Sequence, residues 1–501
     1  MTTHRILPDR ETFRELATRG NLIPVSTELI ADTETPVSAF EKLDRGGYSF
    51  LLESAENPEQ GGRYSFVGSE PRILFEANGR RIRITDNGET REFETQSEPL
   101  RELQSLMSRF RPVETPGLPP FRGGAVGYMA YDMIRFFEPS IGELPPDVLG
   151  IPDMIFMVSD TLLIFDHRLR RIRILANALV EDDADVAYDV ACEKIEAILA
   201  LLGRPALLPQ INIHREIETG PPRSNTTREA FHAMVEKAQE HIRAGDIFQV
   251  VLSQRFEADY EGEALQLYRA LRFINPSPYL FCLKFGDRFS LVGSSPEVHV
   301  RAIDGEVTIR PIAGTRRRGA TPQEDEANAA DLLADPKERA EHLMLVDLAR
   351  NDVGRIADFG SVRVTDFMTI ERYSHVMHIV SNVVGKLREG SNAYDVMRAT
   401  FPAGTVSGSP KVRAMQIING QETSRRGAYA GAVGYFGFDG NHDSCITLRS
   451  VLLKDGKAYV QAGGGVVADS TPEGEYQESQ NKALGMMRAI EHARHITPPP
   501  H

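Results

Sequence analysis

Short runs of alternating apolar and polar residues are the feature that most restricts the folds open to this chain. Between residues 45 and 95 the segments YSFLLES, RYSFVG, RILFEA and RRIRITDNG follow one another with turn residues between them. A period of two residues is typical of half-buried strands, and such closely spaced runs predict antiparallel hairpins. Residues 154–179, MIFMVSDTLLIFDHRLRRIRILANAL, repeat the strand, turn, strand pattern. The sequence therefore predicts a core built on antiparallel sheets.

Helical spacing interrupts these strand blocks. It predicts helices in PVSAFEKLDRG (36–46), in EPLRELQSLMSRFRP (98–112) and from about 183 to 203. Residues 204–227 show no sustained period and end in a Gly, Pro, Ser, Asn and Thr cluster, which favours a linker. We therefore expect an N-terminal region (1–203), a linker (204–227) and a C-terminal domain (228–495).

One segment has an echo elsewhere in the chain. GGAVGYMAYD (123–132) resembles AGAVGYFGFD (430–439). Two units with related sheet edges would explain the likeness, and so would chance, because small residues recur in many strands. The longer segment FRGGAVGYMAYDMIRFFE (121–138) is expected to begin as a strand and continue as a helix.

Composition excludes several classes of protein. The chain is 41% hydrophobic and 26% charged, which is ordinary for a globular protein, and no apolar run approaches the roughly 18 residues of a membrane span. The first twenty residues are polar and mixed in charge, so they predict neither a secretory signal nor an anchor. The net charge of −14 argues against nucleic-acid binding.

The rare residues also carry information. The three cysteines, Cys192, Cys282 and Cys445, lie far apart and fit no zinc or disulfide pattern, so we expect a cytoplasmic protein. The chain has no tryptophan. Chance or lineage bias explains that absence, and so does a need to make the protein when tryptophan is scarce.

Two stretches predict a helix with an acidic start. In DPKERAEHLMLVDLARND (335–352), Asp335 can cap the helix, Pro336 suits its first position and Glu338 occupies the capping-box position. In TPEGEYQESQNKA (471–483), Thr471 and Pro472 fill the corresponding places. The first carboxylates of both helices are therefore explained by capping and by the helix dipole.

Deeper carboxylates on the same helices need another explanation. Glu341 follows Glu338 by three residues, and Glu478 follows Glu475 by three, so each pair shares a helix face. These pairs are either ordinary solvated faces or a site for a hard cation. Oxygen ligands with no His or Cys beside them would select Mg²⁺ over zinc.

A glycine triplet lies close to the second acidic helix. Residues 463–465 expose main-chain N–H groups that no side chain shields, which predicts a nest for an anion. Glu473, Glu475 and Glu478 would repel that anion. A ligand with two carboxylates resolves the conflict, because one can lie in the nest while the other meets the glutamates through Mg²⁺.

Other polar stretches could join this site. Residues 310–319, RPIAGTRRRG, place a Gly-Thr turn beside four arginines, and residues 400–415, TFPAGTVSGSPKVRAM, form a Gly/Ser loop before a helix without the order of a phosphate loop. Glu297 at the end of VGSSPE is a possible acid or a helix-start carboxylate. His375 and His378 in YSHVMHIVS are possible bases or structural hydrogen bonders.

Taken together, these stretches resemble one family, the chorismate-utilising enzymes, and within it the large subunits of anthranilate synthases. The segments occur in family order from about 240 to 485, and LLES and RYSF extend the match toward the N-terminus. They are DIFQVVLSQRF, NPSPYLF, GSSPE, RPIAGTRRRG, EHLMLVDLARNDVGR, YSHVMHIVS, FPAGTVSGSPKVRAM, GAYAGAVGYFG and QAGGGVV. The resemblance implies an α+β fold in which two antiparallel sheets pack as a sandwich with helices outside. It also implies chorismate, a dianion, as substrate.

The resemblance further implies a role for each candidate residue. Glu341 and Glu478 would bind Mg²⁺ on the ring carboxylate, supported through water by Glu338 and Glu475. The substrate would be held by Gly314, Thr315, Tyr429, Arg449, Gly463, Gly464, Gly465 and Lys482. The residues implied in catalysis are Glu297 as general acid, His378 in the release of pyruvate, Thr405 and Gln249.

Two positions favour one member of the family. Aminodeoxychorismate synthases usually carry a nucleophilic lysine in the PIxGT turn, where this chain has Ala313. Isochorismate and salicylate synthases use a lysine to activate water at the position of Gln249, whose neutral amide cannot take a proton. The resemblance therefore implies ammonia as nucleophile and anthranilate as product. The alternatives are an aminodeoxychorismate synthase and a non-catalytic tryptophan-sensing subunit.

The resemblance also implies regulation and a partner. An effector pocket for L-tryptophan would be formed by Glu53, Ser54, Pro278, Tyr279, Leu280 and Cys445. No cysteine lies in an amidotransferase motif, so a separate glutamine amidotransferase subunit is expected to supply ammonia, in a heterodimer or heterotetramer.

Overall fold

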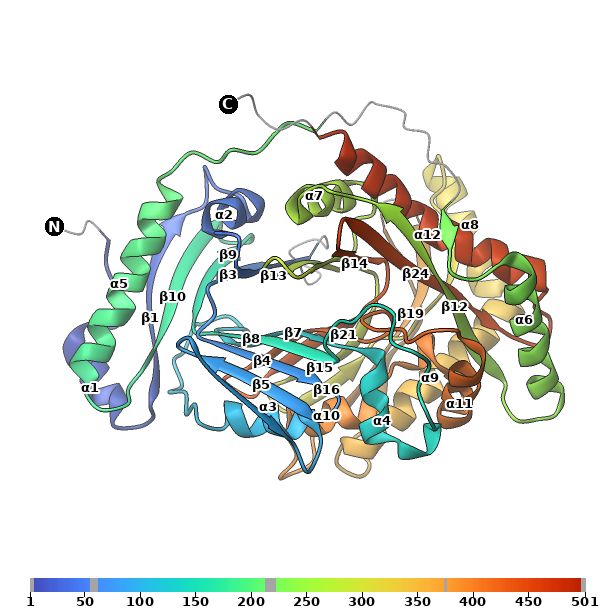
Figure 1. The fold of residues 1–501 in the computed structure, drawn as a ribbon, viewed down its shortest axis with the longest axis horizontal. Helices are drawn as coiled ribbons and strands as arrows, with labels where there is room; N and C mark the ends of the chain where they lie inside the picture. The colour runs from blue at the N-terminus through green and yellow to red at the C-terminus, as the bar shows by residue number, and fades with distance from the viewer. Residues whose placement is uncertain (1–3, 55–61, 212–221, 374–375, 497–501) are drawn as a thin grey trace.

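A computed structural model describes residues 4–54, 62–211, 222–373 and 376–496. In these residues, two sheets of twelve strands each form the centre of the molecule, and the helices lie outside them (Figure 1). All neighbouring strands on the two sheets' main paths pair antiparallel. The expected α+β sandwich is confirmed.

The first sheet joins strands from both halves of the chain. In spatial order it contains β1 (Leu22–Ile30), β10 (Arg171–Leu179), β9 (Thr161–Asp166), β3 (Tyr64–Ser69), β2 (Tyr48–Glu53), β13 (Tyr279–Phe285), β14 (Ser290–Ser295), β23 (Ser450–Lys454), β24 (Lys457–Val466), β12 (Gln249–Asp259) and β11 (Arg223–Ser224), with β20 (Gly408–Ser409) beside β12. The N-terminal strands meet the C-terminal strands where β2 pairs with β13, with Glu53 opposite Leu280.

The second sheet is built in the same way. In spatial order it contains β17 (Ile312–Arg317), β19 (Val376–Lys386), β16 (Glu306–Ile309), β15 (Val298–Ile303), β22 (His442–Ile446), β21 (Ala432–Gly437), β7 (Gly124–Met129), β8 (Met154–Ser159), β4 (Ile73–Asn78), β5 (Arg81–Asp86) and β6 (Glu89–Glu94), with β18 (Arg363–Arg372) beside β19. Here β7 pairs with β21, so the two echoing segments are neighbouring strands in which Gly127 faces Gly434. The N-terminal region therefore adds strands to both sheets, and the division at residues 204–227 stays a prediction.

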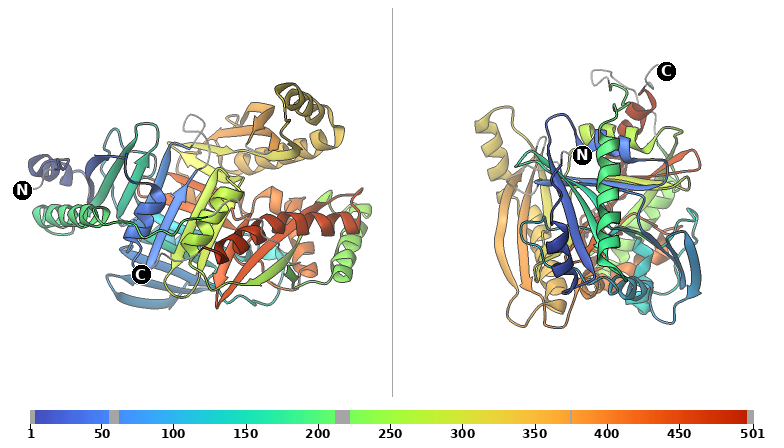
Figure 2. Two further views of the ribbon diagram at one scale, coloured as in Figure 1. Left: turned by 90° about the horizontal axis from the view of Figure 1, so that it is seen from above. Right: turned by 90° about the vertical axis from the view of Figure 1, so that its left-hand side faces the viewer.

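Helices cover the outer faces and the two ends. They are α1 (Arg10–Ala17), α2 (Pro36–Leu43), α3 (Pro99–Met107), α4 (Ile134–Phe137), α5 (Ala184–Leu202), α6 (Arg228–Arg243), α7 (Ala264–Ile274), α8 (Pro322–Ala334), α9 (Pro336–Ile356), α10 (Ala393–Thr400), α11 (Lys411–Gln421) and α12 (Pro472–Arg494), with short 3₁₀ turns η1 (Tyr131–Met133), η2 (Pro139–Ile141) and η3 (Gly404–Val406). α1 and α5 lie at one end of the molecule, and α6 and α12 lie at the other (Figures 1 and 2).

The core forms three main layers. Phe50 and Phe281 of the first sheet pack with Tyr128 and Val433 of the second, so the space between the sheets is an apolar layer. A second layer joins the first sheet to α5, α7 and α12, and a third joins the second sheet to α3 and α10. No helix in the described ranges is long and apolar enough to cross a membrane.

Candidate functional site

One cavity of about 440 Å³ collects the residues expected to bind and convert the substrate. Its lining comes from strands β12, β17, β19 and β24 and from helices α9 and α12. The predicted residues among its lining are Gln249, Glu297, Gly314, Thr315, Glu338, Glu341, His378, Thr405, Tyr429, Arg449, Gly463, Gly464, Gly465, Glu475, Glu478 and Lys482. These positions span more than two hundred residues of sequence, and the fold brings all of them together. His375 lies outside the described residues.

The two acidic helices begin as their capping signals predict. Asp335 accepts hydrogen bonds from the N–H groups of Lys337 and Glu338, and Thr471 accepts from Gly474. The side chain of Glu338 contacts Arg316 at 3.4 Å, and no reciprocal capping-box bond is formed in this helix. Glu338 is therefore available at the cavity wall.

Carboxylates from the two helices repel one another inside the cavity. Burial raises the pKa of Glu341, and the neighbouring charges of Glu338 and Glu478 raise it further. Burial also raises the pKa of Glu475, against a hydrogen bond from Ser470. A cation between these groups would relieve the repulsion.

Some of this negative charge is balanced by protein groups. Lys482 Nζ lies 2.6 Å from Glu478 Oε1 and donates to the carbonyl of Gly463 at 3.0 Å. Glu475 Oε1 accepts from Ser470 at 2.6 Å, whereas its buried Oε2 has no hydrogen-bond partner among the described residues. In the part of the chain that the structure describes, no three His, Cys, Asp or Glu side chains converge on one point. The cavity therefore offers carboxylate oxygens from α9 and α12 as possible ligands of a cation.

The glycine triplet does not form a nest, and that prediction is wrong. Residues 463–465 are extended residues of β24, opposite Ser253, Leu252 and Val251 of β12. The N–H of Ser253 donates to Glu422 and that of Val251 to Ser407, so the pairs with residues 463 and 465 are not hydrogen bonded. The amides of residues 463 and 465 thus face away from β12.

This second edge of β24 is open because β23 pairs with it only as far as Val460. A Cβ at Gly463 would lie 2.1 Å from the main-chain oxygen of Leu252, so close packing requires glycine at that position. A Cβ at Gly464 would lie 2.4 Å from Glu475 Oε2, and one at Gly465 would lie 2.3 Å from Gln249 Nε2. The triplet therefore presents main-chain donors from a strand edge beside the acidic helix.

Glu297 is buried in the loop between β14 and β15, with 6% of its surface exposed. It begins no helix. Burial raises its pKa to about 8, against opposing effects of a hydrogen bond from Thr405 and the charge of Arg449. Thr405 Oγ1 donates to Glu297 Oε1 at 2.6 Å. Glu297 therefore holds a proton near neutral pH and can donate it.

His378 can act as a base, the role opposite to that of Glu297. Its Nδ1 lies 2.8 Å from the carbonyl of Gly314, which can only accept, so Nδ1 carries the proton. Burial lowers the pKa of the imidazole. A neutral ring protonated on Nδ1 leaves Nε2 as an acceptor, as a base requires. Gly314 adopts φ of +68°, which favours glycine at this turn.

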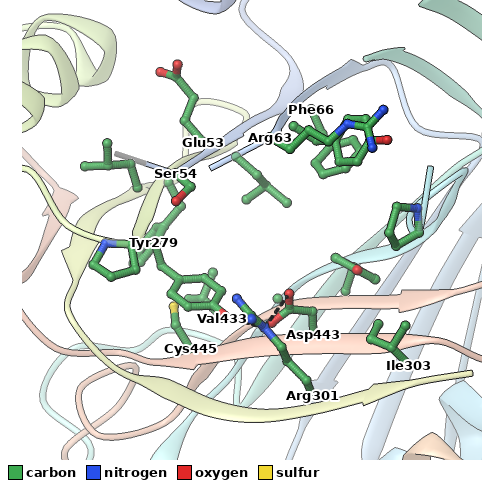
Figure 3. A pocket seen from close by; sticks show the side chains of 18 residues that line it. Glu53, Ser54, Arg63, Phe66, Tyr279, Arg301, Ile303, Val433, Asp443 and Cys445 are labelled. Atoms are coloured by element: carbon green, nitrogen blue, oxygen red, sulfur yellow. Dashed lines mark hydrogen bonds and ion pairs between the residues drawn. The ribbon is translucent and has the colours of Figure 1, made fainter. Parts of the chain in front are cut away.

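A second cavity of about 310 Å³ lies between β2 and β13 of the first sheet and the central strands β15, β22 and β21 of the second (Figure 3). All six predicted effector residues are among its lining: Glu53, Ser54, Pro278, Tyr279, Leu280 and Cys445. One wall is polar, because Tyr279 donates to Asp443 at 2.7 Å and Arg301 pairs with Asp443 at 3.2 Å. The other walls are mainly apolar, with Phe66, Val433 and Ile303 among them.

Glu53 is directed away from this polar wall (Figure 3). Its carboxylate accepts from Tyr268 and pairs with Arg272 at 3.3 Å, both on α7. Leu280 faces the same side as Glu53, because the two are opposite each other across β2 and β13. Both side chains therefore join the strands to the helix layer.

Sequence reasoning missed several residues near the substrate cavity. Lys337 and Gln461 line it. Beneath its floor, a buried Arg426 donates to Glu422 and to the carbonyls of Val251 and Val406. The ion pair could have been suspected from its i, i+4 spacing, but nothing in the sequence shows that it is buried.

Comparison with known proteins places these geometries in context. A family model described as chorismate binding enzyme matches residues 48–488. Anthranilate synthase component 1 of Acetivibrio thermocellus is 46% identical over 494 residues, covering 98% of this chain and 99% of that protein. Its counterpart in Aquifex aeolicus is 48% identical over 482 residues, covering 96% and 97%.

Two solved structures are similar to this chain over most of its length. The crystal structure of anthranilate synthase component I from Streptococcus pneumoniae TIGR4 has a TM-score of 0.74 and 38% identity, covering 92% of this chain and 99% of that one. MenF, the menaquinone-specific isochorismate synthase of Escherichia coli, has a TM-score of 0.70 at 18% identity over 96% and 98% of the two chains, which shows a shared fold.

Proposed function

The chain belongs to the family of chorismate-binding enzymes, and from this premise we propose that it converts chorismate and ammonia to anthranilate and pyruvate. This is the activity named for its relatives, and it would commit chorismate to tryptophan synthesis. The observation that supports it most is the cavity in which a protonated Glu297, a neutral His378 and four carboxylates surround one space.

These residues match the two halves of the reaction. Glu297 donates its proton to the C4 hydroxyl, which leaves as water while ammonia forms a bond to C2 and the ring double bonds shift. In the second half, His378 Nε2 assists removal of the C2 proton as the bond from C3 to the enolpyruvyl oxygen breaks. The enolpyruvyl group leaves as the enolate of pyruvate and takes up the proton removed from C2, while the proton lost from the added ammonium group returns Glu297 to its acid form. The ring becomes aromatic, and atoms and protons balance.

Binding of the dianion is assigned to the two ends of the cavity. The amides of residues 463 and 465 and the guanidinium of Arg449 would hold the enolpyruvyl carboxylate. Tyr429, Gly314 and Thr315 would flank the ring. Thr405 supports the acid, and Lys482 balances charge on α12.

The donor set fits Mg²⁺. Glu341 and Glu478 would be its ligands, with Glu338 and Glu475 acting through water, and the orphaned Oε2 of Glu475 is a buried acceptor that such a shell would satisfy. Mg²⁺ commonly takes one or two carboxylates and keeps waters and substrate oxygens, so two direct carboxylate ligands are enough for it. When bound, it would neutralise the ring carboxylate and fix the orientation of the ring.

Ammonia is the proposed nucleophile because Ala313 and Gln249 lack the amine groups that the alternative reactions use. Ala313 has no amine with which to attack the ring, which disfavours the aminodeoxychorismate alternative. Gln249 is a neutral amide and cannot activate water. Ammonia needs neither form of help, because it is already a nucleophile. The intact acid, base and carboxylate set disfavours a purely sensory subunit.

Ammonia is proposed to come from a separate glutamine amidotransferase subunit. Burial raises the pKa of the thiols of Cys282, Cys445 and Cys192, so none of them is an activated thiolate that could attack glutamine. Free ammonia at high concentration should replace the partner. The name component 1 of the relatives is consistent with a second component.

The second cavity is proposed to bind L-tryptophan as a feedback inhibitor. Its apolar walls suit an aromatic side chain, and the Arg301 and Asp443 pair offers both charges to an amino acid's carboxylate and ammonium groups.

The catalytic proposal is tested by incubating the purified chain with chorismate, Mg²⁺ and ammonium. Anthranilate should accumulate, as seen by its fluorescence, and production should stop when Mg²⁺ is chelated. Aminodeoxychorismate without pyruvate release would favour the alternative enzyme. No turnover of chorismate would remove the proposal.

Ser54→Phe should relieve inhibition by tryptophan with little change in the uninhibited rate. A phenyl ring at Ser54 would occupy the cavity, whereas the substrate cavity is lined by other residues. The measurement is the tryptophan concentration for half inhibition, which should rise by at least about tenfold. Ser54→Ala is the control for loss of the hydroxyl alone. Inhibition that is unchanged in Ser54→Phe would exclude this cavity as the effector site.

A further inference from the structure

A short connector after α7 separates the two cavities. Pro278 lines the effector cavity, and it also lines a third cavity of about 670 Å³, here called the antechamber. The antechamber adjoins the substrate cavity, because both are lined by Thr315, His378 and Arg449. Pro278 therefore lies between the proposed effector and the approach to the proposed substrate, and residues 275–277 line that approach.

Asn275, the first residue of this connector, is held by several hydrogen bonds. It ends α7, and its N–H donates to the carbonyl of Leu271 at 2.8 Å. The Ser294 hydroxyl donates to its main-chain carbonyl, and its side-chain Nδ2 lies 3.3 Å from Ser294 Oγ. Ser294 is fully buried on β14, so Asn275 is tied to the rigid first sheet.

The other polar atom of the Asn275 side chain, Oδ1, contacts a residue of the substrate cavity. Arg449 Nη1 donates to Asn275 Oδ1 at 3.4 Å, and the carbonyl of Arg449 accepts from the N–H of Ser294 at 3.1 Å. Arg449 has φ of +46°, a conformation that is uncommon for a residue with a side chain. Such a backbone persists only where its surroundings hold it. Asn275 and Ser294 supply that hold from two directions.

α7 also reaches the effector cavity at its own C-terminal turn. Arg272 pairs with Glu53 at 3.3 Å, and Tyr268 donates to the same carboxylate. Glu53 is buried and directly precedes Ser54 in the cavity wall. A ligand that displaces Ser54 would act on α7 through Glu53, and one that displaces Pro278 would act on the connector. Asn275 joins α7 to the connector, so either displacement would reach it.

We propose that Asn275 is a positioning residue that aims Arg449 at the substrate and transmits occupancy of the effector cavity to it. The inference rests on the proposed function, since it takes chorismate and tryptophan as the two ligands. In the empty effector cavity, Asn275 Oδ1 holds the guanidinium in its binding orientation. When the effector fills the cavity, Pro278 and the end of α7 shift, and Arg449 loses this acceptor. Reciprocity requires that chorismate weaken tryptophan binding by the same factor.

The test compares Asn275→Ala, Asn275→Asp and wild type by calorimetry without ammonium, so that no turnover occurs. Chorismate and tryptophan dissociation constants are measured alone, and chorismate is measured again at saturating tryptophan. In Asn275→Ala, chorismate should bind about tenfold more weakly, because a charged group loses a hydrogen bond. Tryptophan alone should bind within about twofold of wild type, and the coupling factor should fall toward one.

Asn275→Asp keeps the acceptor and should retain wild-type chorismate affinity, which a merely structural role would not predict. Asn419→Ala on α11 is the matched control, because it also removes one asparagine hydrogen bond, to the carbonyl of Ile141 at 3.2 Å. It should change none of the constants.

Unchanged chorismate affinity and coupling in Asn275→Ala would overturn the inference, as would loss of tryptophan binding in that variant. Failure of wild type to bind tryptophan would instead overturn the effector assignment. In that case the positioning of Arg449 is still decided by the chorismate affinities of the two Asn275 variants.

Discussion

Glu341→Gln should abolish Mg²⁺-dependent anthranilate formation and yet unfold at the same temperature as wild type or a higher one. The same loss of activity is expected for Glu478→Gln. Both residues are proposed ligands on facing helices, so each substitution removes one of the two carboxylates that would bind the ion directly. Metal-ion stabilisation of charge contributes several kcal/mol, so activity should fall by at least about 10³-fold.

The stability of Glu341→Gln follows from the direction of its pKa shift. Burial and the charges of Glu338 and Glu478 raise the pKa of Glu341, so the folded state binds its proton more tightly than the unfolded state. The ionised carboxylate therefore destabilises the metal-free fold at neutral pH. That penalty disappears as the pH falls below the ordinary glutamate value of 4.5. Any gain in the unfolding temperature of Glu341→Gln should thus be present near pH 7 and absent near pH 4.

Glu473→Gln is the matched control on the same helix. Glu473 lies in the first turn of α12 but pairs with Arg228 and His232 outside the cavity. It should keep its activity and its response to Mg²⁺. Normal Mg²⁺-dependent rates in both Glu341→Gln and Glu478→Gln would refute the assignment of the carboxylates. If metal-free Glu341→Gln unfolds at a much lower temperature than wild type, the carboxylate stabilises the fold. That result would contradict the raised pKa of Glu341.

Local signals in the sequence predicted local structure well. Asp335 and Thr471 cap their helices as their types and the following prolines indicate. The alternation in YSFLLE and RIRITD corresponds to β2 and β5. These outcomes depend on residues within one turn or one strand, where the period of side-chain burial is visible in the sequence itself.

Predictions that depended on long-range pairing fared differently. The glycine triplet reads as a nest in isolation, but β12 pairs with it from more than two hundred residues away and extends it into a strand. Glu53 lines the second cavity as predicted, but the register of β2 on β13 turns its carboxylate toward Tyr268 of α7. Asn275 carried no prediction, because its contact with Arg449 depends on the packing of β14 beside that residue. A slip of one residue in register reverses the faces of a strand, so side-chain direction is fixed by partners that the local sequence does not contain.

Glu297→Gln should reduce turnover by about 10²- to 10⁴-fold, the usual contribution of a general acid. The amide has nearly the same shape as the acid but cannot donate the proton that the C4 hydroxyl needs to leave. Chorismate binding should change little, because the carboxyl is buried and its pKa of about 8 keeps it mostly uncharged at neutral pH. The measurement is kcat against chorismate affinity. Glu240→Gln, on the exposed face of α6 and outside the cavity lining, is the control for a surface glutamate.

The same shift predicts how the rate depends on pH, and Thr405 provides a test of its sign. Activity that needs the protonated acid should fall as the pH rises through about 8. Thr405 donates to Glu297 Oε1 and thereby lowers the pKa of the carboxyl, opposing its burial. Thr405→Val removes that donor with little change in volume, so the alkaline fall in kcat/KM should move to higher pH. A fall that stays in place, or that moves to lower pH, would mean that Glu297 is not the group whose proton the reaction consumes.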